Sequence, residues 1–135
     1  MKNASTKFLF FTGKGGVGKT SLACAVAVKY ADEGKKVLLI STDPASNLED
    51  VLQCPVKNEI TPHKIVDNLF TININPEVSA QEYRDRATAP LKGVAPPDEI
   101  NKVVEQLSGA CTTEIASFDE FSRFITGEGS LEKFD

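Results

Sequence analysis

The 135-residue sequence contains no tryptophan, only two tyrosines, one histidine and three cysteines. Its longest strongly apolar run is a few residues, far short of the roughly 20 needed to cross a bilayer. The N-terminus lacks an apolar segment followed by a small-residue cleavage site, so we expect a cytoplasmic protein. An odd number of cysteines without metal-ligand spacing argues against a secreted disulfide framework and favours free thiols.

Composition and charge narrow the class of protein further. Hydrophobic residues make up 41% and charged residues 25% of the chain, which are globular proportions and exclude a disordered tail, a collagen-like fibre or a coiled-coil rod. The length predicts one small domain or part of a larger one. The net charge of −4 divides into +5 over residues 1–36 and −9 over residues 37–135. The acidic remainder, with no basic and aromatic stripe, argues against nucleic-acid binding, whereas the basic end could hold an anion.

The first part of the sequence predicts a strand, a helix and a second strand. Phe8 to Phe11 form a short apolar run typical of a buried parallel strand. The Ala-rich stretch from Thr20 to Glu33 predicts a helix that stops at Gly34. Val37 to Ile40 predict a second buried strand. Together they predict a right-handed strand–helix–strand unit.

The remaining sequence predicts mainly helices. A third strand is expected around residues 69–74, and a loop over residues 91–97, which contain one glycine and two prolines. Asn75 and Pro76 are typical of an N-cap and a first helical position. The expected helices cover residues 47–52, 76–88, 97–109 and 112–126.

Residues 13–20, Gly-Lys-Gly-Gly-Val-Gly-Lys-Thr, match the G-x-x-x-x-G-K-[ST] pattern of a phosphate-binding loop at every position. Glycines allow consecutive backbone N–H groups to turn around an anion, and the following helix adds positive charge at its N-terminus. Lys19 is expected to reach the terminal phosphates and Thr20 to bind Mg²⁺ through its hydroxyl. Lys14 adds a second lysine, which either addresses transition-state charge or is a surface residue without a role. The predicted nucleotide-binding residues are Gly13, Lys14, Gly15, Gly16, Val17, Gly18, Lys19, Thr20 and Ser21.

This loop resembles that of the deviant P-loop ATPases, a group that includes arsenical pump ATPases, tail-anchored-protein targeting ATPases, cell-division and partition ATPases and the nitrogenase iron protein. Residues 41–47, Ser-Thr-Asp-Pro-Ala-Ser-Asn, and residues 107–121 are similar to the arsenical pump-driving ATPases known as ArsA, in their N-terminal half. The resemblance implies an α/β P-loop NTPase fold with a parallel sheet flanked by helices, incomplete in this chain. It also implies that residues 1–135 are the front portion of one ATPase domain, with a helical metalloid-site subregion over about residues 76–126.

The resemblance assigns roles to two further residues. The resemblance implies that Asp43 is the aspartate that orients or deprotonates the attacking water. From residue type alone, Asp43 could also be a magnesium-binding carboxylate or a turn residue. Cys111, close to a predicted helix start that favours thiolate, becomes a ligand for As(III) or Sb(III). A lone cysteine is more often a small core residue. Of the others, Cys24 is expected in the core, Cys54 matches no motif, and His63 is expected to face solvent.

The function implied by the resemblance is ATP hydrolysis with Mg²⁺, driving arsenite or antimonite extrusion through a membrane permease. A second ATPase half or a homodimer partner, and a metalloid chaperone, are the other expected partners, and the protein would lie at the inner membrane through the permease. No strand after Asp43 ends in a second site aspartate, so this chain alone is expected to bind nucleotide weakly without turnover. Two alternatives stay open: a tail-anchored-protein targeting ATPase, which would need a Met-rich or apolar groove, and an iron–sulfur reductase with Cys111 as a cluster ligand.

Overall fold

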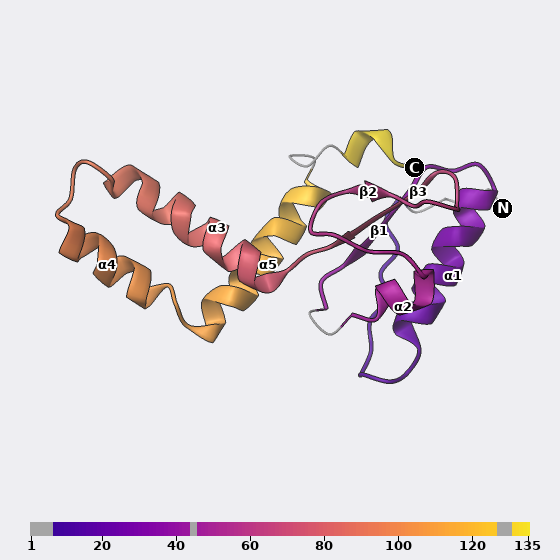
Figure 1. The fold of residues 1–135 in the computed structure, drawn as a ribbon, viewed down its shortest axis with the longest axis horizontal. Helices are drawn as coiled ribbons and strands as arrows, with labels where there is room; N and C mark the ends of the chain where they lie inside the picture. Colours follow the sequence, from indigo (N-terminus) through magenta and orange to yellow (C-terminus); the bar gives the residue numbers. More distant parts are fainter. Residues whose placement is uncertain (1–6, 44–45, 127–130) are drawn as a thin grey trace. The chain divides into compact units, whose positions relative to one another are not determined.

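The computed structural model describes residues 7–43, 46–126 and 131–135 (Figure 1). These residues divide by packing into two compact units. Unit 1 contains residues 7–41, 46–72 and 132–135, and unit 2 contains residues 42–43, 73–126 and 131. The turn residues Pro44 and Ala45, which the sequence placed after the second strand, lie outside the described residues.

Unit 1 combines helices with a three-stranded sheet. Its elements are α1 (Lys19–Asp32), β1 (Val37–Ser41), α2 (Leu48–Leu52), β2 (Thr61–Pro62) and most of β3 (Leu69–Asn73). The strands lie in the order β1-β3-β2. β2 pairs with β3 in antiparallel register, with Thr61 opposite Thr71. The α/β class predicted from the sequence is therefore confirmed, and the sheet contains an antiparallel pair that the sequence did not indicate.

The first predicted strand is wrong in this structure. Residues 8–11 have no regular secondary structure and lie outside the sheet, and the side chains of Phe8, Leu9 and Phe10 are 39%, 55% and 60% exposed. An apolar run becomes a strand only when a neighbouring strand pairs with it along its length. In the described part of the chain the sheet is built from β1, β3 and β2, so the predicted strand–helix–strand unit is not formed.

The core of unit 1 lies between its two helices and the sheet. Small residues of α1 (Cys24, Ala27 and Ala31) pack with the leucines of α2 and with Leu69 of β3. The alanines let the helix approach closely, and the leucines supply the apolar area whose burial stabilises the unit. Burial raises the pKa of the Cys24 thiol, which confirms the expected core position of this residue and keeps it protonated at neutral pH.

Phe134 and Asp135 bind the start of β1. The backbone N–H of Asp135 donates to the Lys36 carbonyl at 2.8 Å, and the Lys36 N–H donates to the Asp135 carboxylate at 2.7 Å. The Phe134 ring packs edge-on against Phe70, with the ring centres 5.3 Å apart. These contacts hold the last described residues within unit 1 although they are almost 100 positions from Lys36 in the sequence.

Unit 2 is helical. It contains α3 (Pro76–Thr88), the short 3-10 helix η1 (Ala89–Leu91), α4 (Pro97–Gln106) and α5 (Ala110–Ile125). A second 3-10 helix is η2 (Leu131–Lys133).

Helices α3 and α5 pack side by side (Figure 1). Ser79 donates a hydrogen bond to Glu120 across this contact, and Arg86 pairs with Asp119 at 2.8 Å. The small side chains of Ala80 and Ala116, 0% and 1% exposed, let the two helices approach closely.

The N-cap of α3 provides a first prediction. The Asn75 side chain accepts from the backbone N–H of Glu77 at 2.9 Å and of Val78 at 3.4 Å. Asn75→Ala removes both acceptors, and we expect it to lower the free energy of unfolding by about 1 kcal/mol in urea denaturation. Asn47→Ala is the matched control, because Asn47 stands at the N-cap of α2 without a side-chain cap hydrogen bond. Equal losses in both variants would contradict a capping role for Asn75.

Candidate functional site

The glycine-rich loop ends directly in a helix. α1 begins at Lys19, and Gly18 is its N-cap with φ +87°, in the left-handed region. No side-chain hydrogen bond caps this end, and no acidic residue lies in the first turn. The first N–H groups of α1 and the positive end of its dipole therefore have no side-chain acceptor or acidic neighbour in that turn, as an anion site requires.

Gly13 shows why the start of the loop must lack a side chain. Its φ is +152°, and a Cβ at this position would lie 3.3 Å from Cγ2 of Val17 and 3.6 Å from Cδ of Lys19. A larger residue would therefore crowd the Val17 side chain and strain the backbone, with the Lys19 stem in van der Waals contact. Glycine at this position thus allows the backbone turn that starts the loop.

The two loop lysines differ in their contacts. The Lys19 ammonium donates to the backbone carbonyl of Lys14 at 3.3 Å, so the ammonium lies over the loop itself. The side chain of Lys19 is half-buried, whereas Lys14 is exposed. Lys19 is thus positioned by the loop, and Lys14 presents its charge to solvent. Thr20 is half-buried and Ser21 exposed in the first turn of α1.

Asp43 lies two residues after the end of β1 and is exposed. It clusters with unit 2, whereas the loop of residues 13–20 belongs to unit 1. The structure thus supports the predicted position at the end of a strand, and the role of Asp43 toward the loop stays a prediction.

Cys111 is exposed and is the second residue of α5. The helix begins at Ala110, two residues earlier than predicted, because Gly109 adopts an extended conformation and acts as the N-cap. The thiol therefore lies in the first helical turn, near the positive end of the helix dipole. Among the residues that the structure describes, no group of three or more His, Cys, Asp and Glu side chains could hold a metal ion. Cys111 thus stands here as a single candidate ligand.

Cys54 differs from Cys111 in its surroundings. It follows α2 and lines a hollow of about 200 Å³ together with Pro55, Lys57, Thr61, Pro62 and Lys64. Burial raises the pKa of the Cys54 thiol, Glu49 raises it further, and Lys64 opposes the shift. At neutral pH the residue is therefore the neutral thiol, which is a poor ligand for a soft ion.

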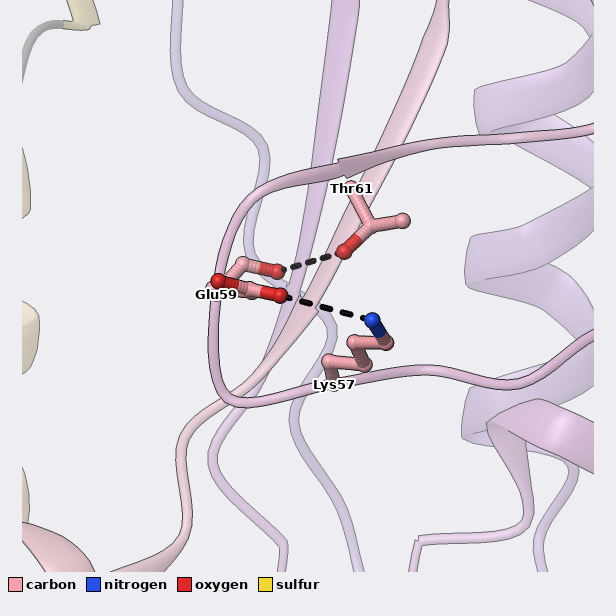
Figure 2. A network of polar contacts seen from close by, with 3 residues as sticks. All are labelled: Lys57, Glu59 and Thr61. Carbon is pink, nitrogen blue, oxygen red and sulfur yellow. Dashed lines mark hydrogen bonds and ion pairs between the residues drawn. The ribbon is translucent and has the colours of Figure 1, made fainter.

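The rim of this hollow is a turn held by local contacts (Figure 2). The Thr61 hydroxyl donates to the Glu59 carbonyl at 3.0 Å. The Lys57 ammonium lies 3.5 Å from a carboxylate oxygen of Glu59, and the two side chains are 62% and 71% exposed. An exposed pair of this kind contributes little to stability. The turn thus has a structural explanation and no evident role in binding.

His63 is not the solvent-facing residue that the sequence suggested. It is half-buried, and its Nδ1 accepts from the backbone N–H of Val66 at 2.9 Å and of Ile65 at 3.2 Å. Its Nε2 lies 3.3 Å from the Leu52 carbonyl. Because Nδ1 accepts two hydrogen bonds, Nε2 must carry the proton and donate. His63 therefore connects the end of α2 to the loop before β3, which is a structural role.

A larger groove of about 700 Å³ lies in unit 2, where α3, α4 and α5 meet. Arg84 lines it from α3, and the first turn of α5 contributes Ala110 and Thr113. The groove is lined by Glu77, Gln81, Arg84, Val104, Ser108, Ala110, Thr113 and Glu114. No motif in the sequence indicates Arg84.

Comparison with known proteins identifies the class. The family model described as "Anion-transporting ATPase" matches residues 6–135. The chain therefore belongs to the anion-transporting (ArsA) ATPase family, whose members are P-loop NTPases, and the resemblance drawn from the loop and the two other segments is confirmed.

The sequence is also similar to individual proteins of this family. Over 128 residues, 95% of this chain, the sequence is 52% identical to the arsenical pump-driving ATPase of Acidiphilium multivorum and to one of Escherichia coli. A protein of Paramecium tetraurelia, "ATPase ASNA1 homolog 2", is 39% identical over 84 residues, which are 62% of this chain and 26% of that protein. The chain spans only 22% of the length of the two pump-driving ATPases. In the described residues, no helix is long and apolar enough to cross a membrane.

Proposed function

We propose that residues 13–21 bind the phosphates of ATP as part of an arsenical pump-driving ATPase. The observation that carries the proposal is the glycine loop ending in an α1 N-terminus without a side-chain cap or an acidic neighbour. The family match and the 52% identity to pump-driving ATPases support the choice of nucleotide and pump. The alternative of a tail-anchored-protein targeting ATPase rests on a more distant and shorter match, and no observation favours the iron–sulfur reductase.

Each residue of the loop has a role in this proposal. Backbone N–H groups of Gly15 to Lys19 surround the phosphates, and the Lys19 ammonium moves from the Lys14 carbonyl to the terminal phosphates. The hydroxyl of Thr20 would hold Mg²⁺, which when bound draws charge from the phosphoryl oxygens. Asp43 orients the attacking water, and Lys14 reaches a paired ATPase half or a second copy. This chain by itself is proposed to bind ATP weakly and without turnover.

The second part of the proposal concerns the pumped ion. Cys111 binds As(III) or Sb(III) as one thiolate ligand, and the remaining ligands come from other parts of the full protein. Hydrolysis then drives arsenite or antimonite extrusion through a membrane permease, with a metalloid chaperone as a further partner. The protein would work in the cytoplasm at the inner face of the membrane.

The direct test of the nucleotide site is binding of MgATP to this chain, measured by isothermal titration calorimetry. Binding that is lost when Mg²⁺ is chelated supports a P-loop with magnesium at Thr20. Heat of binding that is equal for ATP and for adenosine would overturn the proposal, because the loop contacts only phosphates.

Cys111 provides a prediction for the metalloid site. In the full-length protein carrying Cys54→Ser, where the remaining ligands are present, we expect arsenite to slow the alkylation of Cys111 by iodoacetamide, because a thiolate bound to arsenic is not nucleophilic. Cys24 is 3% exposed and serves as the internal control, since arsenite should leave its slow alkylation unchanged. The modified residue is identified by peptide mass spectrometry. Alkylation of Cys111 at the same rate with and without arsenite would remove Cys111 from the metalloid site.

A further inference from the structure

The turn between α4 and α5 lies directly before Cys111. α4 ends at Gln106 and α5 begins at Ala110, so three residues form the connection. Cys111 follows as the second residue of α5. Packing on α3 fixes the body of α5, so the turn bears on its first residues, Cys111 among them.

The turn has several hydrogen bonds of its own. The backbone N–H of Leu107 donates to the Val103 carbonyl at 3.0 Å, and that of Ser108 to the Glu105 carbonyl at 3.1 Å. The Ser108 hydroxyl donates to the Val104 carbonyl at 2.6 Å. These bonds keep the turn attached to the end of α4, but none of them connects it to α3.

Arg84 supplies the connection from α3. Its guanidinium donates through one terminal nitrogen to the Leu107 carbonyl at 3.4 Å, across 23 positions of sequence. Its other terminal nitrogen donates to the side-chain oxygen of Gln81 at 3.0 Å. Gln81 in turn donates to the Asp85 carboxylate at 3.1 Å. The planar fork is thus held on its own helix while it reaches the turn, and both bonds are strengthened by the arginine charge.

The groove that Arg84 lines also reaches the first turn of α5. Arg84 is half-buried and lines the same groove as Ala110 and Thr113 of that turn, which contains Cys111. A second arginine of α3, Arg86, pairs with Asp119 in the middle of α5 and not with the turn. Arg84 therefore contacts the turn before α5, whereas Arg86 contacts α5 itself.

We propose that Arg84 is a positioning residue for the metalloid site: its guanidinium, held by Gln81 on α3, bonds the Leu107 carbonyl and so holds the turn before Cys111 against α3. Arg84 acts through the backbone and does not itself touch the metalloid. The inference rests on the proposed role of Cys111, but the rigidity of the turn can be measured without any metalloid.

The experiment is hydrogen–deuterium exchange of the amides of residues 107–112 in the 135-residue chain. Arg84→Met keeps the apolar stem and removes both bonds, and we expect exchange to rise about tenfold, as for the loss of one charge-assisted hydrogen bond. Arg86→Met is the matched control and should change exchange there by less than about twofold. Arg84→Lys keeps the charge without the fork and should give an intermediate rate. Unchanged exchange in Arg84→Met, or full rescue by Lys, would overturn the proposal.

Two further measurements complete the test. If Arg84→Met loses its helical circular dichroism, Arg84→Lys decides, because it keeps the charge and lacks the fork; exchange at residues 107–112 equal to that of the unsubstituted chain would then refute the proposal. Arsenite protection of Cys111 is measured with the same substitutions in the full-length protein, which carries the remaining ligands. Absence of protection in the unsubstituted full-length protein would refute the metalloid role alone, whereas normal protection in a folded Arg84→Met variant would refute the positioning role.

Discussion

Lys19→Met is expected to weaken MgATP binding by about 100-fold or more. The substitution keeps the apolar stem, which lies near the backbone of Gly13, and removes the ammonium that the loop holds against the Lys14 carbonyl. Charge-assisted hydrogen bonds contribute about 1.5–3 kcal/mol each, so losing contacts to two phosphates corresponds to at least about two orders of magnitude in the dissociation constant. Calorimetric titration with MgATP measures the change.

Lys29→Met is the matched control for this prediction. Lys29 lies on the same helix, but its side chain is 72% exposed and 4.0 Å from Glu33. Lys29→Met removes the same charge from the chain without changing the loop. Its effect on MgATP binding should therefore be less than about threefold and should disappear at high salt. If both variants lose affinity equally, the attraction is a property of the basic N-terminal region and the loop has no specific site.

The helices were the part of the fold that the sequence predicted best, because their signals are local. Asn75 followed by Pro76 gave the start of α3 correctly, and the side-chain cap of Asn75 is present. Gly34 ended α1 within one residue of the predicted position. The start of α5 was placed two residues late, because Gly109 caps this helix through its backbone conformation and not through a side-chain hydrogen bond.

Pairing between distant segments was predicted less well. Residues 8–11 have the composition of a buried strand, yet whether they form one depends on a neighbouring strand and not on their own sequence. β2 has only two residues, one of them Pro62, and a proline normally argues against a strand. The contacts of His63 and Arg84 are likewise invisible in the sequence, since their partners are backbone carbonyl or N–H groups that any residue could supply.

In the candidate site, too, the residues with local sequence signals could be predicted and those without could not. The phosphate-binding loop could be recognised because four of its eight positions have a chemical requirement at fixed spacing and the helix follows directly. Cys111 and Asp43 could be singled out only through the family resemblance, because one thiol or one carboxylate has no motif of its own. Arg84 could not be found in either way, although Gln81, Arg84 and Asp85 are spaced for contacts along one helix face.

The second large expected effect concerns the core that packs against α1. Leu69 is 1% exposed and packs in the cluster formed by α1, α2 and β3. Leu69→Ala is expected to lower the free energy of unfolding by about 3 kcal/mol, within the range of about 2–5 kcal/mol for buried leucines. A domain of ordinary stability has about 5–15 kcal/mol in total. Urea denaturation followed by circular dichroism measures the loss, and Ile65→Ala, at an 81% exposed position, should change it by less than about 0.5 kcal/mol.

Nucleotide binding can show whether this loss reaches the loop. α1 carries the N-terminal N–H groups on its first turn and the core residues Cys24, Ala27 and Ala31 further along. Because Leu69 packs against the core side of the helix, we expect Leu69→Ala to leave the dissociation constant for MgATP nearly unchanged. A saturating ligand stabilises the folded state by an amount set only by its concentration and that constant. The stability gained from MgATP should therefore be equal in Leu69→Ala and in the unsubstituted chain. A smaller gain in the variant would mean that the core position of α1 sets the geometry of the phosphate loop.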